Sequence, residues 1–143
     1  MEESQGLLHG EITVQIIKTF FEVHTESGGI GFPESVYKRA MVIALRQKGL
    51  HCGVEVPMAV MFRGQNIGNY RADLIVEKLV IVEIKTGSKI HEVDQRQTYN
   101  YLKTTKLKVA LILNFGIKAE FERCYFDPKP RRREVSDESV NSV

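Results

Sequence analysis

The hydrophobic and polar positions of the chain follow two periodicities, and their order predicts the secondary structure. Residues 11–24 and 33–49 carry apolar side chains at helical spacing, so each predicts a helix with one buried face. The polar segment 91–105 predicts a third helix. Five short runs rich in β-branched and aromatic residues predict strands: VEVPMAVMF (54–62), IGNYRADLIVE (67–77), KLVIVEIKT (78–86), KVALILNF (108–115) and AEFERCYF (119–126). The order α-α-β-β-β-α-β-β indicates an α/β or α+β domain with a mixed sheet.

Turn-forming residues separate these elements at the expected places. The glycines of TESGGIGF (25–32) end the first helix, and Pro33 suits the first position of the second. Gly49 is a plausible stop at the end of that helix. We expect hairpin turns at RGQN (63–66) and EK (77–78).

Length and composition indicate one globular domain followed by a tail. The chain has 143 residues, 43% hydrophobic and 27% charged, which is enough for a core without metals or disulfides. We place this domain at residues 1–126. Residues 127–143 have almost no apolar content, so we expect a disordered basic and polar tail. Within it, KPRRR (129–133) could be a localisation signal, a phosphate-binding arm or part of a solvated tail.

Charge, cysteine content and hydropathy bear on the partners and the cellular location of the protein. The net charge of +2 permits a polyanionic partner without requiring one. The two cysteines do not form a C-x-x-C pair or a disulfide framework. We find no apolar signal core at the N-terminus and no run of about 18 apolar residues. We therefore expect an intracellular protein, cytoplasmic or nuclear, without a membrane span.

Three charged side chains interrupt the apolar segment RADLIVEKLVIVEIK (71–85). Because side chains alternate along a strand, Glu83 and Lys85 share a face. If the hairpin turn centres on Lys78, Asp73 lies opposite Glu83, with Cβ atoms about 5 Å apart. A slip of one residue in the register would turn Asp73 to the other face.

A divalent cation would explain these charges. Two carboxylates in an apolar hairpin repel each other and lose hydration, so one of them tends to hold its proton. Mg²⁺ takes carboxylate oxygens and keeps several waters for a phosphate. Lys85 could then act near the attacking water or contact the phosphate oxygens. The structural alternative is a salt bridge between Lys85 and a carboxylate at the end of the sheet.

Two helices offer further polar candidates. Glu34 falls in the first turn of the second helix, and Tyr37 lies on the same helix face. Gln97 and Tyr101 are four residues apart on the later helix and also share a face. The structural alternatives are a helix-start preference for Glu34, because the helix dipole favours a carboxylate there, and a packed tyrosine beside a surface glutamine.

Several of these motifs together resemble the GxxExxY family. GFPESVY (31–37) carries the glycine, glutamate and tyrosine that name it, and YRADLIVEKLVIVEIK (70–85) resembles its next block. Q-x-x-x-YLK (97–103) and NFG (114–116) follow in the same order. The resemblance covers roughly residues 10–126, and each motif is weak alone but strong in combination.

The resemblance implies a place in the PD-(D/E)XK nuclease-like superfamily. The implied fold is a restriction-endonuclease-like core, a mixed four-stranded sheet flanked by helices. Asp73 and Glu83 would be metal ligands together with the carbonyl of Ile84, and Lys85 would be the catalytic lysine. Glu34 would complete or orient the metal site.

The resemblance also suggests contacts with nucleic acid. Gln97 and Tyr101 match an element thought to hold the active-site lysine or the nucleic-acid strand. We group Tyr37 with them as a candidate contact, although the family gives it no firm role. The sequence departs from the superfamily name at one position, since Ala72 stands where a proline would precede Asp73.

Three hypotheses of function follow. The first is a Mg²⁺- or Mn²⁺-dependent nuclease that hydrolyses phosphodiester bonds in DNA. The second is a catalytically weak or inactive nuclease-fold module that binds nucleic acid or a partner protein. The third is a dimeric junction-resolving nuclease, in which a homodimer supplies two cuts.

Overall fold

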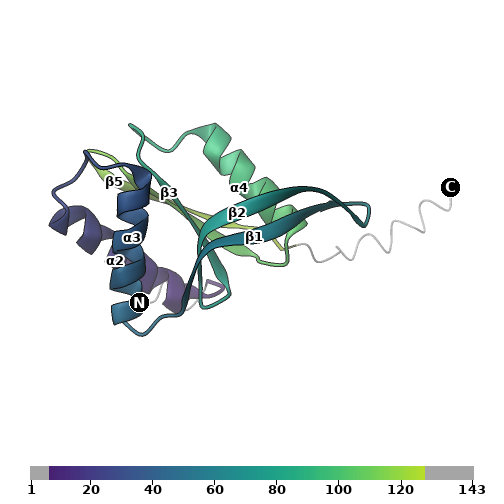
Figure 1. Cartoon of the computed structure of the whole chain (residues 1–143), viewed down its shortest axis with the longest axis horizontal. Coiled ribbons are helices and arrows are strands. Elements are labelled where there is room, and N and C mark those ends of the chain that lie inside the picture. Colours follow the sequence, from purple (N-terminus) through teal and green to yellow (C-terminus); the bar gives the residue numbers. More distant parts are fainter. Residues whose placement is uncertain (1–6, 128–143) are drawn as a thin grey trace.

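The structure, a computed structural model, describes residues 7–127 and shows three helices and five strands (Figure 1). The elements in chain order are α2 (Gly10–Glu26), α3 (Glu34–Gln47), β1 (Cys52–Phe62), β2 (Gln65–Val76), β3 (Val80–Lys85), α4 (Glu92–Thr104), β4 (Val109–Phe115) and β5 (Ala119–Tyr125). The predicted order α-α-β-β-β-α-β-β is confirmed. Of the predicted tail, only Asp127 lies within the described residues, so KPRRR lies outside them.

The strands form one mixed sheet in the order β1-β2-β3-β4-β5. β3 and β4 are parallel, and the other neighbouring pairs are antiparallel. Parallel neighbours need a long crossover, and α4 provides it. The family resemblance implied four core strands, whereas five strands are present here. Over residues 7–127, no helix combines the length and the apolar character needed to cross a membrane.

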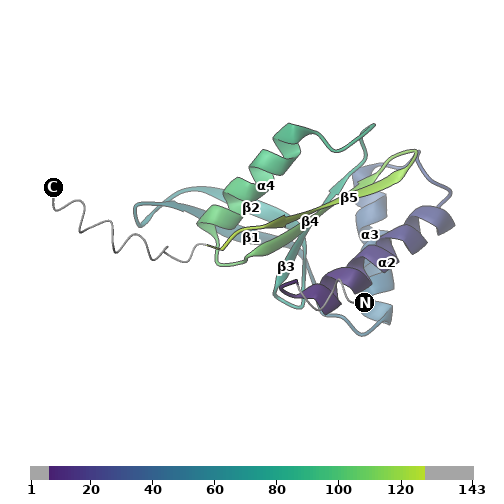
Figure 2. The same cartoon turned by 180° about the vertical axis from the view of Figure 1, so that it is seen from behind.

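Helices cover both faces of the sheet (Figures 1 and 2). On one face, the apolar stripes of α2 and α3 pack against the strands through residues such as Phe20 and Met41, both fully buried. On the other face, Leu102 of α4 packs against Ile81 and Ala110. Every residue of β4 is buried, as expected for a strand covered on both sides.

The turn between β2 and β3 fixes the register of the charged hairpin. Glu77 and Lys78 both have positive φ, 54° and 60°, as a tight type I′ hairpin turn requires. The Leu79 N–H donates to the Val76 carbonyl at 3.0 Å, and Leu74 then pairs with Val82. The predicted turn at residues 77–78 and its centre on Lys78 are therefore confirmed.

α3 (Glu34–Gln47) is shorter at both ends than the predicted helix 33–49. Pro33 precedes the helix as its N-cap, with an extended ψ of 161°, and so lies one position before the predicted one. At the other end, Gly49 has a φ of 84° and its N–H donates to the Arg46 carbonyl at 2.9 Å. This is the predicted glycine stop. The start of α3 matters because Glu34 is its first residue.

Candidate active site

Regular pairing of β2 with β3 stops just before Asp73, and its pairing with β1 is interrupted at the same residue. Towards β3, Asp73 Oδ2 accepts a hydrogen bond from the Ile84 N–H at 2.8 Å, so a side chain satisfies this backbone donor. Towards β1, the opposite residue Glu55 has a φ of 49°, in the left-handed region. The regular pairs Val54–Leu74 and Val56–Ala72 lie on either side of it. Asp73 therefore belongs to a local distortion of the sheet.

Glu83 lies next to Asp73 and is largely buried. Burial raises the pKa of its carboxyl to about 7, and the charge of Glu34 adds to the rise, while Lys85 and Lys38 oppose it. A backbone interaction with Asp73 also opposes the rise, which places the two acidic residues side by side. Among the described residues, no group forms a hydrogen bond with Glu83 Oε2, although this atom is buried. A buried carboxylate oxygen without a partner is costly, so this position favours a proton or a cation.

The first two turns of α3 carry two oppositely charged side chains, Glu34 and Lys38, that act on these carboxylates. Glu34 is exposed, and its negative charge adds to the rise in the Glu83 pKa. Lys38 lies one turn further, on the same helix face. Its Nζ is 2.9 Å from Glu55 Oε2 and 3.7 Å from Asp73 Oδ1. The acidic group on β2 and β3 thus has a lysine from α3 beside it.

A cavity of about 270 Å³ opens between the sheet and α4. Glu83 and Lys85 line it together, which agrees with their predicted common face. Its lining also includes Gln97 and Tyr101, so this set of predicted residues comes together. The remaining lining residues are Asn69, Tyr70, Arg71 and Thr98.

Contacts inside this cavity hold its polar groups in place. Lys85 Nζ lies 3.8 Å from Asp94 Oδ1 at the start of α4. The Gln97 amide donates to the Tyr101 hydroxyl at 3.2 Å. The ring of Tyr101 stacks on Tyr70 with centroids 3.5 Å apart. One wall of the cavity is therefore an aromatic pair, next to an amide and an ammonium group.

Tyr37 does not lie in this cavity. Its side chain is 1% exposed, and its ring stacks on Phe115 at a centroid distance of 4.3 Å. Its hydroxyl donates to the Gly29 carbonyl and accepts from the Phe32 N–H, so it holds the loop before α3. This burial leaves almost no surface for a ligand, and Tyr37 has no part in the function proposed below.

Asn114 at the end of β4 fixes the loop that follows Lys85. Its side chain is fully buried, accepts from the Gly87 N–H at 2.9 Å and donates to the Gly87 carbonyl at 3.0 Å. A Cβ at Gly116 would stand 2.9 Å from that same carbonyl oxygen, so the close approach requires glycine. The motif NFG therefore has a structural reason, because it anchors the chain just after the candidate lysine.

Three residues of this region were not predicted from the sequence. Lys38 could have been found because it follows Glu34 by four residues on one helix. Asp94 precedes Gln97 by three residues on α4, which is the same kind of signal. Tyr70 carried no local signal, because its contact with Tyr101 depends on how α4 packs on the sheet.

The donor set fits a divalent ion only in part. Asp73 and Glu83 come from neighbouring strands, and the buried Glu83 oxygen without a partner suits a cation. Within residues 7–127, however, no group of three His, Cys, Asp or Glu side chains is arranged to hold a metal. Mg²⁺ keeps several waters and is often bound by one or two carboxylates together with substrate phosphates, so Asp73 and Glu83 fit an ion that a phosphate helps to hold.

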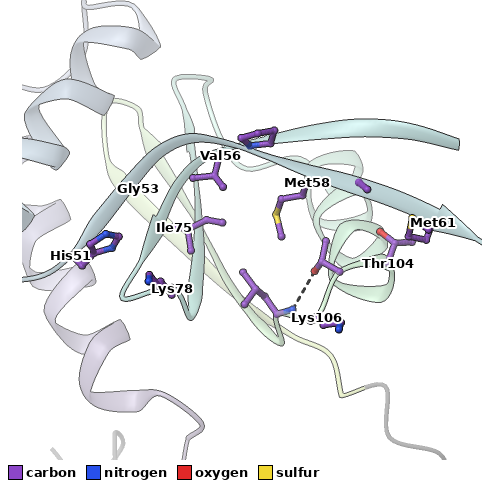
Figure 3. Close-up of a pocket in the computed structure, with 13 residues that line it drawn as sticks. His51, Gly53, Val56, Met58, Met61, Ile75, Lys78, Thr104 and Lys106 are labelled. Carbon is purple, nitrogen blue, oxygen red and sulfur yellow. Dashed lines mark hydrogen bonds between the residues drawn. The ribbon is translucent and has the colours of Figure 1, made fainter. Parts of the chain in front are cut away.

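A larger cavity, of about 580 Å³, lies along β1 and the segment after α4 (Figure 3). Its walls are mostly apolar and include Val56, Met58 and Ile75. Lys78 and Lys106 also line it, whereas none of its described lining residues is acidic. The two cavities therefore differ strongly in chemistry.

Comparison with known proteins identifies a superfamily for this chain. The sequence model of the PD-(D/E)XK nuclease superfamily matches residues 10–124. No curated protein matches the chain. The crystal structure of SSO0001 is similar with a TM-score of 0.52 and 15% identity, over 77% of this chain. The chain spans 59% of that protein, and this likeness concerns the fold alone. The narrower GxxExxY resemblance stays a prediction.

Proposed function

Because the chain belongs to the PD-(D/E)XK nuclease superfamily, we propose that it is a metal-dependent nuclease that hydrolyses phosphodiester bonds in DNA. One observation carries the proposal. Glu83, whose buried oxygen has no partner among the described groups, lines the same cavity as Lys85. A cation site and a positive group for phosphate are thus adjacent, as this chemistry requires.

Asp73 and Glu83 would hold Mg²⁺ or Mn²⁺, with the Ile84 carbonyl as a further ligand. Glu34 would support the ion from the start of α3. A divalent ion bound there would activate water and offset the charge that develops on the phosphate. The hairpin register sets Asp73 beside Glu83. The two carboxylates could therefore share an ion without a large rearrangement of the backbone.

Lys85 would act on the attacking water or on the phosphate oxygens. Its ammonium group is held near Asp94 and lies in the cavity beside Glu83. It can therefore stabilise negative charge that develops as water attacks phosphorus. The loop anchored by Asn114 limits how far the end of β3 can move.

Gln97 and Tyr101 would place the nucleic-acid strand. Their hydrogen-bonded pair comes from α4, and the buried ring of Tyr70 stacks on Tyr101 and supports it from the sheet. Stacking of bases on aromatic rings is tolerant of sequence. This arrangement supports binding without a strong sequence preference.

Cleavage assays with Mg²⁺ and with Mn²⁺ test the proposal. The full chain is incubated with single-stranded DNA, duplex DNA and RNA, beside Asp73→Asn and the exposed control Glu26→Gln. We expect metal-dependent cleavage of DNA that Asp73→Asn lowers at least about 100-fold and the control leaves unchanged. Equal cleavage by Asp73→Asn, or none by the wild type with any substrate, contradicts it.

A second candidate function is a module that binds nucleic acid without efficient cleavage. One observation favours it: both oxygens of Asp73 already have protein partners, the Ile84 N–H and Lys38. Under this alternative, Asp73→Asn and Lys85→Ala bind DNA nearly as well as the wild type, and added metal has no effect. Fluorescence anisotropy with labelled DNA, with and without Mg²⁺, separates the two functions.

A further inference from the structure

Lys38 places a positive charge inside the candidate metal site. Its side chain is 17% exposed, and its Nζ lies between the carboxylates of two neighbouring strands. The shorter contact, 2.9 Å, is with Glu55 on β1, and the longer, 3.7 Å, is with Asp73 on β2. No other lysine within the described residues has a salt bridge to Asp73.

Asp73 has no free oxygen for a metal in this arrangement. Oδ2 accepts from the Ile84 N–H, and Oδ1 faces the ammonium group of Lys38. A divalent ion bound to Asp73 and Glu83 would stand close to Lys38, and like charges at such distances repel strongly in a partly buried site. The ion and Lys38 therefore compete for the same carboxylate.

Glu55 offers Lys38 a second position. Its carboxylate already makes the closer contact, and its side chain is half exposed at the edge of the sheet. The left-handed φ of Glu55 interrupts β1 at the residue opposite Asp73. The two carboxylates that Lys38 reaches are thus neighbours, one inside the candidate site and one outside it.

We propose that Lys38 is a tethered counter-ion that sets the metal affinity of the site. It neutralises Asp73 in the metal-free protein and moves fully onto Glu55 when a divalent ion binds. Lys38 is thus a positioning residue that acts through Asp73 and Glu55. This inference rests on the proposed function, because it assumes that Asp73 and Glu83 bind the ion.

Calorimetric titration of Mn²⁺ into the full chain, without nucleic acid, tests the inference. Lys38→Met removes the competing charge, so we expect Mn²⁺ to bind at least about tenfold more tightly. Glu55→Gln removes the second position, so Lys38 stays on Asp73 and binding weakens roughly threefold. The matched control is Lys48→Met, because Lys48 also pairs with a glutamate, Glu22 of α2, at the other end of α3. It should bind as the wild type does.

Lys38→Met and Glu55→Gln should change the Mn²⁺ affinity in opposite directions. A merely structural role for Lys38 would not produce this difference. Unchanged or weaker binding by Lys38→Met, when the wild type binds and Asp73→Asn does not, overturns the inference and leaves the metal site intact. No binding by any variant overturns both. Circular dichroism checks folding, and if Lys38→Met is unfolded, Glu55→Gln decides. Binding by Glu55→Gln that equals or exceeds that of the wild type then contradicts the inference.

Discussion

Of the two cavities on the α4 side of the sheet, the larger is not the one lined by the charged groups. The larger, about 580 Å³, is mostly apolar, and its described lining residues include no carboxylate (Figure 3). The smaller, about 270 Å³, is lined by Glu83, Lys85, Gln97 and other polar or aromatic groups. Volume and apolar lining would select the larger cavity as the candidate site. The charged side chains that the fold must stabilise select the smaller cavity instead.

The difference has a physical origin in the strands that form each cavity. β1 is an edge strand with the apolar run 56–62, so the space beside it is lined by side chains that need no partner. β3 is a central strand, and Glu83 and Lys85 interrupt its buried run. A charge in a buried strand raises the cost of folding unless it has a partner. We therefore place the proposed nuclease function in the smaller cavity.

Matched lysines of the two cavities should give the largest contrast. Lys85 lines the smaller cavity and Lys106 the larger. We expect Lys85→Ala to lower DNA cleavage by about 10²–10⁴-fold, the usual effect of removing a group that acts in the transition state. Lys106→Ala should cleave at nearly the wild-type rate. Equal losses in the two variants would show that the larger cavity takes part in catalysis.

Replacement of Glu83 by glutamine should stabilise the metal-free protein at alkaline pH. The pKa of this carboxyl is raised from 4.5 to about 7, so the folded state favours the protonated form. The contribution of the Glu83 carboxyl to the free energy of unfolding is therefore fully present below pH 4.5 and is lost as the pH rises through 7. We expect Glu83→Gln to be more stable than the wild type by about 2–3 kcal/mol at pH 8 and by little at pH 4.

Urea unfolding in the presence of a chelator measures this difference. The exposed Glu120→Gln serves as control and should not change the pH dependence. A Glu83→Gln variant that is as unstable at pH 8 as the wild type would mean that burial of this charge has no cost. The larger cavity has no acidic residue among its described lining, so it offers no similar effect.

Loss of the Asn114 side chain should destabilise the protein, by less than Glu83→Gln stabilises it at pH 8. Asn114→Ala leaves both backbone groups of Gly87 without their partners, which costs about 2 kcal/mol. The loop after Lys85 should loosen, and cleavage should slow more than substrate binding weakens. Urea unfolding and steady-state kinetics measure the two effects. A change in stability below about 0.5 kcal/mol would rule out an anchoring role.

Truncation in the larger cavity should have the smallest effect. Met58 is partly buried and packs at the edge of the core beneath α4. Met58→Ala should cost about 1 kcal/mol of stability, less than for a fully buried methionine, and leave cleavage unchanged. A loss of cleavage comparable with that of Lys85→Ala would erase the contrast between the cavities.

Local patterns were sufficient for the elements and the hairpin, but not for the surroundings of the site. The turn at Glu77 and Lys78 set the register, and the register placed Asp73 beside Glu83. The roles of Lys38 and Asp94 depend on how α3 and α4 rotate over the sheet, and no local pattern specifies that rotation. Tyr37 shares a helix face with Glu34 in sequence, yet its burial against Phe115 follows from packing.

A crystal structure with Mn²⁺ and its anomalous scattering would test the central claim most directly. We expect one strong anomalous peak between β2 and β3, within coordinating distance of an Asp73 oxygen and a Glu83 oxygen. In the same structure, Lys38 should contact Glu55 alone. An absence of any peak at this position with millimolar Mn²⁺, or a peak only at another site, would contradict the account.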